Sequence, residues 1–180
     1  QIHPSVFFSH IDSGIESPYD FIGKKIAIKS EGWRDTYTRM MENIDVDKGK
    51  ITVLDVSDDI TLFYDKKVDV WSGYAHDEPV EAQLAGYETN FIYPVDYGVM
   101  KHAGAIFTTR KNVNENPELV KRFLKASLDG WNYTIQHPDE VAQYTVNRNP
   151  DELILEFQEV GLSKLIPLMH TGDVPFGWIN

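Results

Sequence analysis

Short apolar runs separated by polar turns predict buried strands along the first hundred residues of the chain. Between these runs, apolar residues stand three and four positions apart, which is the spacing of an amphipathic helix. Ser57 and Pro79 are residue types that favour a helix N-terminus, and Gly86 is one that favours a helix end. The predicted strands cover 24–28, 50–56, 68–71 and 89–93, and the predicted helices cover 33–44, 57–66 and 79–84.

The order of these segments is strand, helix, strand, helix, strand, helix, strand. Such alternation is typical of a mostly parallel sheet with helices on its faces, so the predicted fold class is α/β. A further short apolar run at 6–8 precedes the first helix and ends at the polar turn Asp12-Ser13-Gly14.

The pattern changes after Tyr97-Gly98. One more strand is expected at 105–109, and a proline that follows Asn116, His137 and Asn149 opens each of three predicted helices. The Gly- and Pro-rich tail at 167–180 is expected to be irregular. The chain therefore divides into an α/β part and a helical part, joined near 98–105.

Charge and composition narrow the classes of partner. The 180 residues carry 28 acidic and 17 basic side chains, which gives a formal net charge of −11. Such a surface repels phosphate backbones and anionic lipids, so we expect no nucleic-acid partner.

The chain has no Cys, which excludes disulfides, Cys-ligated zinc, iron–sulfur clusters and thiol catalysis. No run approaches the roughly 20 apolar residues of a membrane helix. Because the chain begins with Gln1 and has no basic leader, we expect a processed start or a boundary within a longer protein.

Common catalytic signatures are missing from the sequence: it has no phosphate-binding glycine loop, nucleophile elbow or zinc-protease motif. His76-Asp77-Glu78 joins three possible metal ligands, but neighbours in sequence rarely face one ion, so no metal site is expected. The acidic pair Asp58-Asp59 is better interpreted as a capped helix start than as a glycosidase pair. Two alternatives stay open: an enzyme that uses Asp58 and Glu78 as acid and base, and a fragment retained only for assembly.

The position of three loops favours ligand binding. In open α/β sheets, ligands bind beyond the carboxyl ends of the strands. The loops that follow three of the predicted strands carry hydroxyls, carboxylates and the aromatic faces of Trp33 and Tyr74, which suit an uncharged or cationic ring compound. Glu31 and Asp58 would repel a phosphate. These loops cover 30–33, 57–59 and 72–78.

A series of segments stands in an order that is found in a known family. The segments are DSGI at 12–15, SPYDFIGKKI at 17–26, VDVWSGY at 68–74, DEP at 77–79, PVDYG at 94–98, FTT at 107–109, NPELVKRFLKAS at 116–127, GW at 130–131 and HPDE at 137–140. Over about residues 1–157 the chain thus resembles ABC-type solute-binding proteins, and more narrowly the branch named for thiamine-pyrimidine biosynthesis.

The resemblance implies a periplasmic-binding-protein fold of type II, in which two lobes close on a small molecule. Each lobe has a mostly parallel sheet flanked by helices. Residues 18–98 would form the second lobe, and residues 1–16 and 102–180 would form part of the first lobe, whose N-terminal half-lobe is absent from this chain. The same branch includes enzymes that make the pyrimidine with a Cys-rich motif. Because the chain has no Cys, we expect a protein that is not an enzyme and has no cofactor.

The implied function is non-catalytic binding of a small heteroaromatic molecule, such as a thiamine pyrimidine precursor, for ABC-type uptake. It implies an ABC permease as partner and a periplasmic or other extracytoplasmic location. The alternative is an extracytoplasmic sensing domain of a histidine kinase or a cyclic-dinucleotide signalling protein, since both classes share this module. The family has an asparagine before Glu78 where this chain has Asp77, which bears on the identity of the ligand.

Ten residues are candidate ligand contacts. Trp33 and Tyr74 are expected to stack on the ligand, Glu78 to accept hydrogen bonds from it, and Ser30 and Ser72 to orient it. Tyr97 is added by resemblance alone, and His3 and Ser5 are expected to line the cleft from the first lobe. Glu31 and Ser57 complete the set from the same loops.

Overall fold

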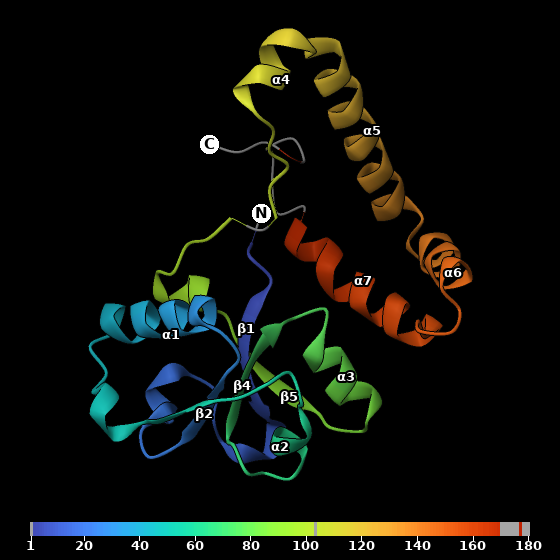
Figure 1. Ribbon diagram of the computed structural model, residues 1–180. Helices are drawn as coiled ribbons and strands as arrows, with labels where there is room; N and C mark the ends of the chain where they lie inside the picture. Colours follow the sequence, from blue (N-terminus) through green and yellow to red (C-terminus); the bar gives the residue numbers. More distant parts are fainter. Residues whose placement is uncertain (1, 103, 170–176, 178–180) are drawn as a thin grey trace. The chain divides into compact units, whose positions relative to one another are not determined.

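The computed structural model describes residues 2–102, 104–169 and 177, and it divides the chain into two compact units. One unit is His3–Lys101, and the other comprises the described residues of 1–2 and 102–180. The boundary between the two units lies at residues 101–102, within the stretch 98–105 where the sequence predicts a change from an α/β part to a helical part. Each unit is described below by itself (Figure 1).

A five-stranded mixed sheet forms the centre of the unit His3–Lys101, with strand order β3-β2-β4-β1-β5. β2 pairs in parallel with β3 and β4, whereas β1 is antiparallel to both of its neighbours, β4 and β5. The strands are β1 (Ser5–His10), β2 (Lys25–Ile28), β3 (Thr52–Asp55), β4 (Val70–Tyr74) and β5 (Thr89–Ile92). The four strands of the predicted alternation therefore run in one direction, as expected.

In the domain division expected from the resemblance, residues 1–16 lie in a different lobe from 18–98, whereas in the structure strand β1 pairs with strands of the unit His3–Lys101. β1 instead lies between β4 and β5, and all six of its residues are buried. The physical reason is its composition: Val6, Phe7 and Phe8 are each 0% exposed, so the strand presents apolar side chains to both faces of the sheet. Its insertion also makes the sheet mixed rather than mostly parallel.

Helices cover the sheet of this unit on either side. On one face, helix α1 (Glu31–Asn43) buries Trp33, Tyr37, Met40 and Met41 against the sheet, where the Phe7 ring lies 5.9 Å from the Trp33 ring, centroid to centroid. On the other face, the Phe8 ring packs edge-on against Phe63 of helix α2 (Thr61–Tyr64), at a centroid distance of 5.0 Å. The remaining helices are α3 (Glu78–Leu84) and the 3-10 helices η1 (Ile11–Ser13), η2 (Pro18–Phe21), η3 (Lys48–Lys50) and η4 (Pro94–Tyr97).

The second unit is helical in the part that the structure describes. It contains α4 (Arg110–Glu115), α5 (Pro117–Gln136), α6 (Pro138–Arg148) and α7 (Leu155–Met169). Proline occupies the first turn of α5 and of α6, where its missing N–H group costs no intrahelical hydrogen bond. The N–H group of Ile2 donates to the Leu168 carbonyl at 2.9 Å, which ties the start of the chain to the end of α7.

Three predictions about this unit are wrong. Pro150 opens no helix, since residues 150–152 form a turn and the third long helix, α7, begins at Leu155. Residues 105–109 form no strand, and Phe107 in this segment is 93% exposed; the described part of this unit contains no strand with which the segment could pair. The tail was expected to be irregular from residue 167, but α7 continues through Pro167 to Met169. The rest of the tail, except residue 177, lies outside the described residues. Among the described helices, none combines the length and the apolar character needed to cross a membrane.

Candidate functional site

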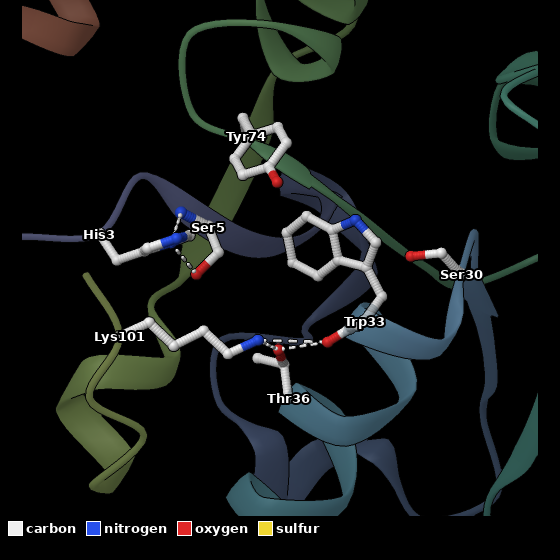
Figure 2. A pocket seen from close by; sticks show the side chains of 8 residues that line it. His3, Ser5, Ser30, Trp33, Thr36, Tyr74 and Lys101 are labelled. Carbon is white, nitrogen blue, oxygen red and sulfur yellow. Dashed lines mark hydrogen bonds between the residues drawn. The ribbon is translucent and has the colours of Figure 1, made fainter. Parts of the chain in front are cut away.

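The candidate site is a cavity of about 120 Å³ at the carboxyl ends of β2 and β4, within the unit His3–Lys101 (Figure 2). Ser30 follows β2 and begins α1, and Tyr74 is the last residue of β4. Because β1 is antiparallel, its first residue, Ser5, pairs with Tyr74 at the same edge of the sheet. The lining residues are His3, Ser5, Ser30, Gly32, Trp33, Thr36, Tyr74 and Lys101.

Aromatic rings form one wall of the cavity. The ring centroids of Trp33 and Tyr74 lie 5.3 Å apart at an interplanar angle of 55°, and the His3 ring lies 6.1 Å from Tyr74. Trp33 is held by the core and is only 7% exposed, whereas Tyr74 is 38% exposed and stands at the edge. Figure 2 shows the two rings converging above the cavity. Such a wall can stack on a planar ligand.

The opposite side of the cavity is polar and carries one cation. The ammonium group of Lys101 donates hydrogen bonds to the Thr36 hydroxyl and, at 3.2 Å, to the Gly32 carbonyl. No carboxylate is among the lining residues, although the chain as a whole carries a net charge of −11. The cavity is therefore locally positive and rich in hydroxyl groups.

The N-terminus of α1 lies at the cavity. Ser30 is the N-cap residue, and its side chain makes no capping hydrogen bond in the structure. The Ser30 hydroxyl points toward the Trp33 indole in Figure 2. Since a helix N-terminus carries partial positive charge, this end of α1 adds to the preference for ligand groups that accept hydrogen bonds.

His3 lines the cavity as a neutral ring. The Ser5 N–H group donates to His3 Nδ1 at 3.2 Å, so this nitrogen acts as an acceptor and the neutral ring carries its proton on Nε2. The Ser5 hydroxyl lies 2.9 Å from the same nitrogen. Burial lowers the pKa of His3, and the positive charge of Lys101 lowers it further. The ring can therefore offer an uncharged N–H donor at neutral pH.

The structure brings five of the ten candidate contacts together in this cavity: His3, Ser5, Ser30, Trp33 and Tyr74. It does not place the other five in the lining. Glu31 is exposed beside Arg34, and Ser57 is exposed, with its hydroxyl 3.4 Å from the Asp59 N–H group. Tyr97 ends η4 and packs partly buried against the core, which raises the pKa of its hydroxyl.

Ser72 and Glu78 lie in the interior rather than in the cavity lining. Ser72 is 0% exposed and stands opposite Phe7 in the sheet, and its hydroxyl oxygen has no hydrogen-bond partner among the described residues. Glu78 forms an ion pair with Lys29, and its Oε2 atom accepts a hydrogen bond from the Tyr74 N–H group at 2.9 Å. The carboxylate expected to meet the ligand is thus engaged within the protein.

Sequence reasoning missed Gly32, Thr36 and Lys101. Thr36 stands four residues after Gly32 and three after Trp33, the spacing of one helical turn, so the predicted helix over 33–44 could have pointed to Thr36. No local signal marks Lys101, because its approach to α1 depends on the path of the chain after η4. Within residues 2–102 and 104–169, no group of three or more His, Asp or Glu side chains is arranged to hold a metal ion.

Two curated relatives are binding proteins. The formylaminopyrimidine-binding protein of Halalkalibacterium halodurans is 32% identical over 107 residues, which cover 57% of this chain and 32% of that protein. The riboflavin-binding protein RibY of Chloroflexus aurantiacus is 27% identical over 172 residues, which cover 93% of this chain and 49% of that protein. The chain therefore spans at most about half the length of these curated relatives.

Solved structures share the fold at low sequence identity. The periplasmic aliphatic sulphonate binding protein SsuA of Escherichia coli superposes with a TM-score of 0.72 at 16% identity, over 89% of this chain and 52% of that chain. SsuA of Xanthomonas axonopodis pv. citri, bound to MOPS, gives a TM-score of 0.58 at 14% identity, over 89% of this chain and 55% of that chain. These likenesses show an α/β fold of the periplasmic-binding type.

The family itself is shown by the sequence over most of the chain. The profile described as NMT1/THI5 like matches residues 1–141 of the 180, and both curated relatives named above are small-molecule binding proteins. Together with the fold, this match identifies the chain as a member of the NMT1/THI5-like family.

Proposed function

We propose that this chain is part of a non-catalytic solute-binding protein that takes up a small heteroaromatic molecule, with a thiamine pyrimidine precursor as the first candidate. The observation that carries this proposal is the cavity in which the Trp33 and Tyr74 rings face hydroxyl groups and the Lys101 ammonium. An aromatic wall with a few convergent polar groups is the usual composition of a small-molecule site. We further propose delivery of the solute to an ABC permease in a periplasmic or other extracytoplasmic space.

The size of the cavity favours a single-ring group. Pockets that enclose a whole drug-sized ligand measure about 300–1,000 Å³, whereas this cavity measures about 120 Å³. We therefore assign it to one ring of the ligand, with the remaining contacts supplied by a further part of a complete solute-binding protein. A pyrimidine with amino and hydroxyl substituents matches the lining, since it can both stack and hydrogen-bond.

The helical unit supports the proposal that the chain holds only part of a first lobe. Large apolar side chains remain exposed along α5 and before it, including Phe107, Leu119, Phe123 and Trp131. We propose that residues 3–101 correspond to one lobe and that residues 102–180 contribute to the other. The relatives, of which this chain covers half or less, are longer than this chain, which is compatible with a first lobe of which this chain holds only part.

The placement of the acidic residues supports a binding role over catalysis. A general acid and base must both reach the bound substrate. Asp58 is 91% exposed with its Oδ1 atom 3.4 Å from Lys29, and Glu78 is paired with the same Lys29. Neither carboxylate lines the cavity.

A calorimetric titration tests the proposal. The full 180-residue chain is titrated with formylaminopyrimidine, an aminomethyl-hydroxymethyl pyrimidine, riboflavin and an alkanesulfonate. We expect saturable binding of a pyrimidine without turnover, as checked by recovery of the unchanged compound. Saturable binding of the sulfonate alone, or conversion of any compound into product, would contradict the proposal.

A further inference from the structure

The polar cluster behind the cavity is built around Glu78, the first residue of α3. Its carboxylate links α3 to the ends of β2 and β4. Oε1 pairs with the ammonium of Lys29, the residue between the end of β2 and Ser30, and Oε2 accepts from the N–H group of Tyr74, the last residue of β4. Ser30, which follows Lys29 in the sequence, and Tyr74 itself both line the cavity.

This cluster is removed from water. The side chains of Lys29 and Glu78 are 11% and 8% exposed, so each charge depends on the other for compensation. The outer neighbour of Lys29 is Asp58, which is almost fully exposed and lies at 3.4 Å. The inner pair therefore holds the geometry, and Asp58 contributes little because water screens it.

Gly73 makes the close approach of the carboxylate to the strand possible. A Cβ atom at this position would lie 2.5 Å from Glu78 Oε2 and 3.2 Å from the Phe8 ring. The first distance is too short for a Cβ atom, so the carboxylate would have to move away, and the second is tight. The absence of a side chain at Gly73 thus lets Glu78 reach over β4 to the Tyr74 N–H group.

We propose that Lys29 and Glu78 are positioning residues that fix Tyr74 against Trp33 and so pre-form the aromatic wall of the cavity. The hydrogen bond from the Tyr74 N–H group fixes the backbone from which the ring projects, and the ion pair fixes the carboxylate that accepts this bond. Tyr74 needs such support because it ends its strand and its ring is partly exposed at the sheet edge. A pre-formed wall raises the affinity, because no free energy is spent on ordering the Tyr74 ring when the ligand binds.

The role in ligand binding rests on the proposed function, whereas the role in placing Tyr74 does not. The two are therefore tested separately. In the ligand-free wild-type chain, amide hydrogen exchange of Tyr74 is measured by NMR. We expect protection of this N–H group well above that of an exposed amide, and exchange at the rate of an exposed amide would overturn the proposal.

Two double variants separate positioning from stability. Lys29→Met with Glu78→Gln removes both charges but keeps an amide oxygen that can accept from the Tyr74 N–H group. Lys29→Met with Glu78→Leu removes the acceptor as well. With 5-fluorotryptophan labelling and Trp33→Phe to assign the signal, we expect the fluorine resonance of Trp33 to stay in place in the first variant and to move or broaden in the second. Asp58→Asn is the matched control and should leave it unchanged.

Binding of the pyrimidine then tests the functional part. We expect the variant with Gln to bind within about twofold of wild type and the variant with Leu to bind about tenfold more weakly, as the loss of one buried hydrogen bond implies. Equal behaviour of both variants in resonance and affinity would overturn the positioning role. If the fluorine resonance responds as expected while no compound binds even the wild type, the positioning of Tyr74 stands and the proposed function fails.

Discussion

Tyr74 and Trp33 show how burial separates a binding residue from a core residue of the same kind. Both were predicted as stacking faces, and both line the cavity. Trp33 is nearly buried and contacts Phe7, so its removal would damage the core. Tyr74 is partly exposed at the sheet edge, so it can be changed with less damage to the fold.

Substitution of Tyr74 by Ala is expected to weaken pyrimidine binding about tenfold or more, because an aromatic contact and the apolar area beneath it are lost. The melting temperature should change little. Titration calorimetry and thermal unfolding measure the two effects. Tyr19→Ala is the control, since Tyr19 is exposed and lies outside the cavity lining. A Tyr74→Ala chain that binds like the control would contradict the assigned role.

Two histidines among the described residues have lowered pKa values and predict a pH dependence of stability. Burial lowers the pKa of both His3 and His76 below the ordinary value of 6.5. As pH falls through 6.5, the unfolded chain takes up protons that the folded rings do not bind, so the free energy of unfolding decreases toward acid. Urea unfolding at pH 7.5 and 5.5 measures this loss. It should be smaller in His3→Asn, and an equal loss in the variant would refute the contribution of His3.

At the scale of elements, the sequence predicts the helices and strands that depend on the local spacing of apolar residues. The strands of the alternation and the helix that carries Trp33 follow from apolar spacing, and the structure confirms them. The position of β1 could not be predicted, because the run Val6-Phe7-Phe8 is equally suited to any buried strand and its partners lie more than 60 residues away. The segment at 105–109 shows the opposite case, in which strand-forming residues lie in a unit whose described part contains no strand.

Contacts between segments that are distant in the sequence also limit the prediction of the candidate site. Ser30, Trp33 and Tyr74 could be placed there because strand ends precede loops that gather at one edge of a sheet. Glu78 belongs to one of these loops, but its Lys29 partner comes from another strand, and no sequence pattern shows that pairing. Lys101 was missed for the same reason.

The central position of β1 predicts a large effect of one substitution. Phe7→Ala should lower the free energy of unfolding by about 3–5 kcal/mol, because a fully buried aromatic ring is removed from the core. Ile11→Ala, at an exposed position directly after the strand, should change it by less than about 0.5 kcal/mol. Urea unfolding followed by circular dichroism measures both. Similar small effects would show that β1 is not part of the core.

At the scale of the whole molecule, the division into two units predicts that one unit folds when it is produced alone and that the other does not fold stably by itself. Residues 3–101 contain a sheet whose core cluster lies entirely within the unit. Produced alone, this segment should unfold cooperatively in urea. Residues 102–180 alone should bind a hydrophobic dye and associate, because their helices expose large apolar side chains. A helical segment that stays monomeric and binds no dye would contradict the proposal that a further part of the protein covers it.

The most direct test of the account is an NMR titration of the labelled full chain with the pyrimidine that binds best in calorimetry. We expect the largest changes of chemical shift at four cavity residues: Ser30, Gly32, Tyr74 and, at its indole N–H group, Trp33. Shifts confined to residues 104–169, or no shifts at saturating concentration, would contradict the claim that this cavity is the solute-binding site.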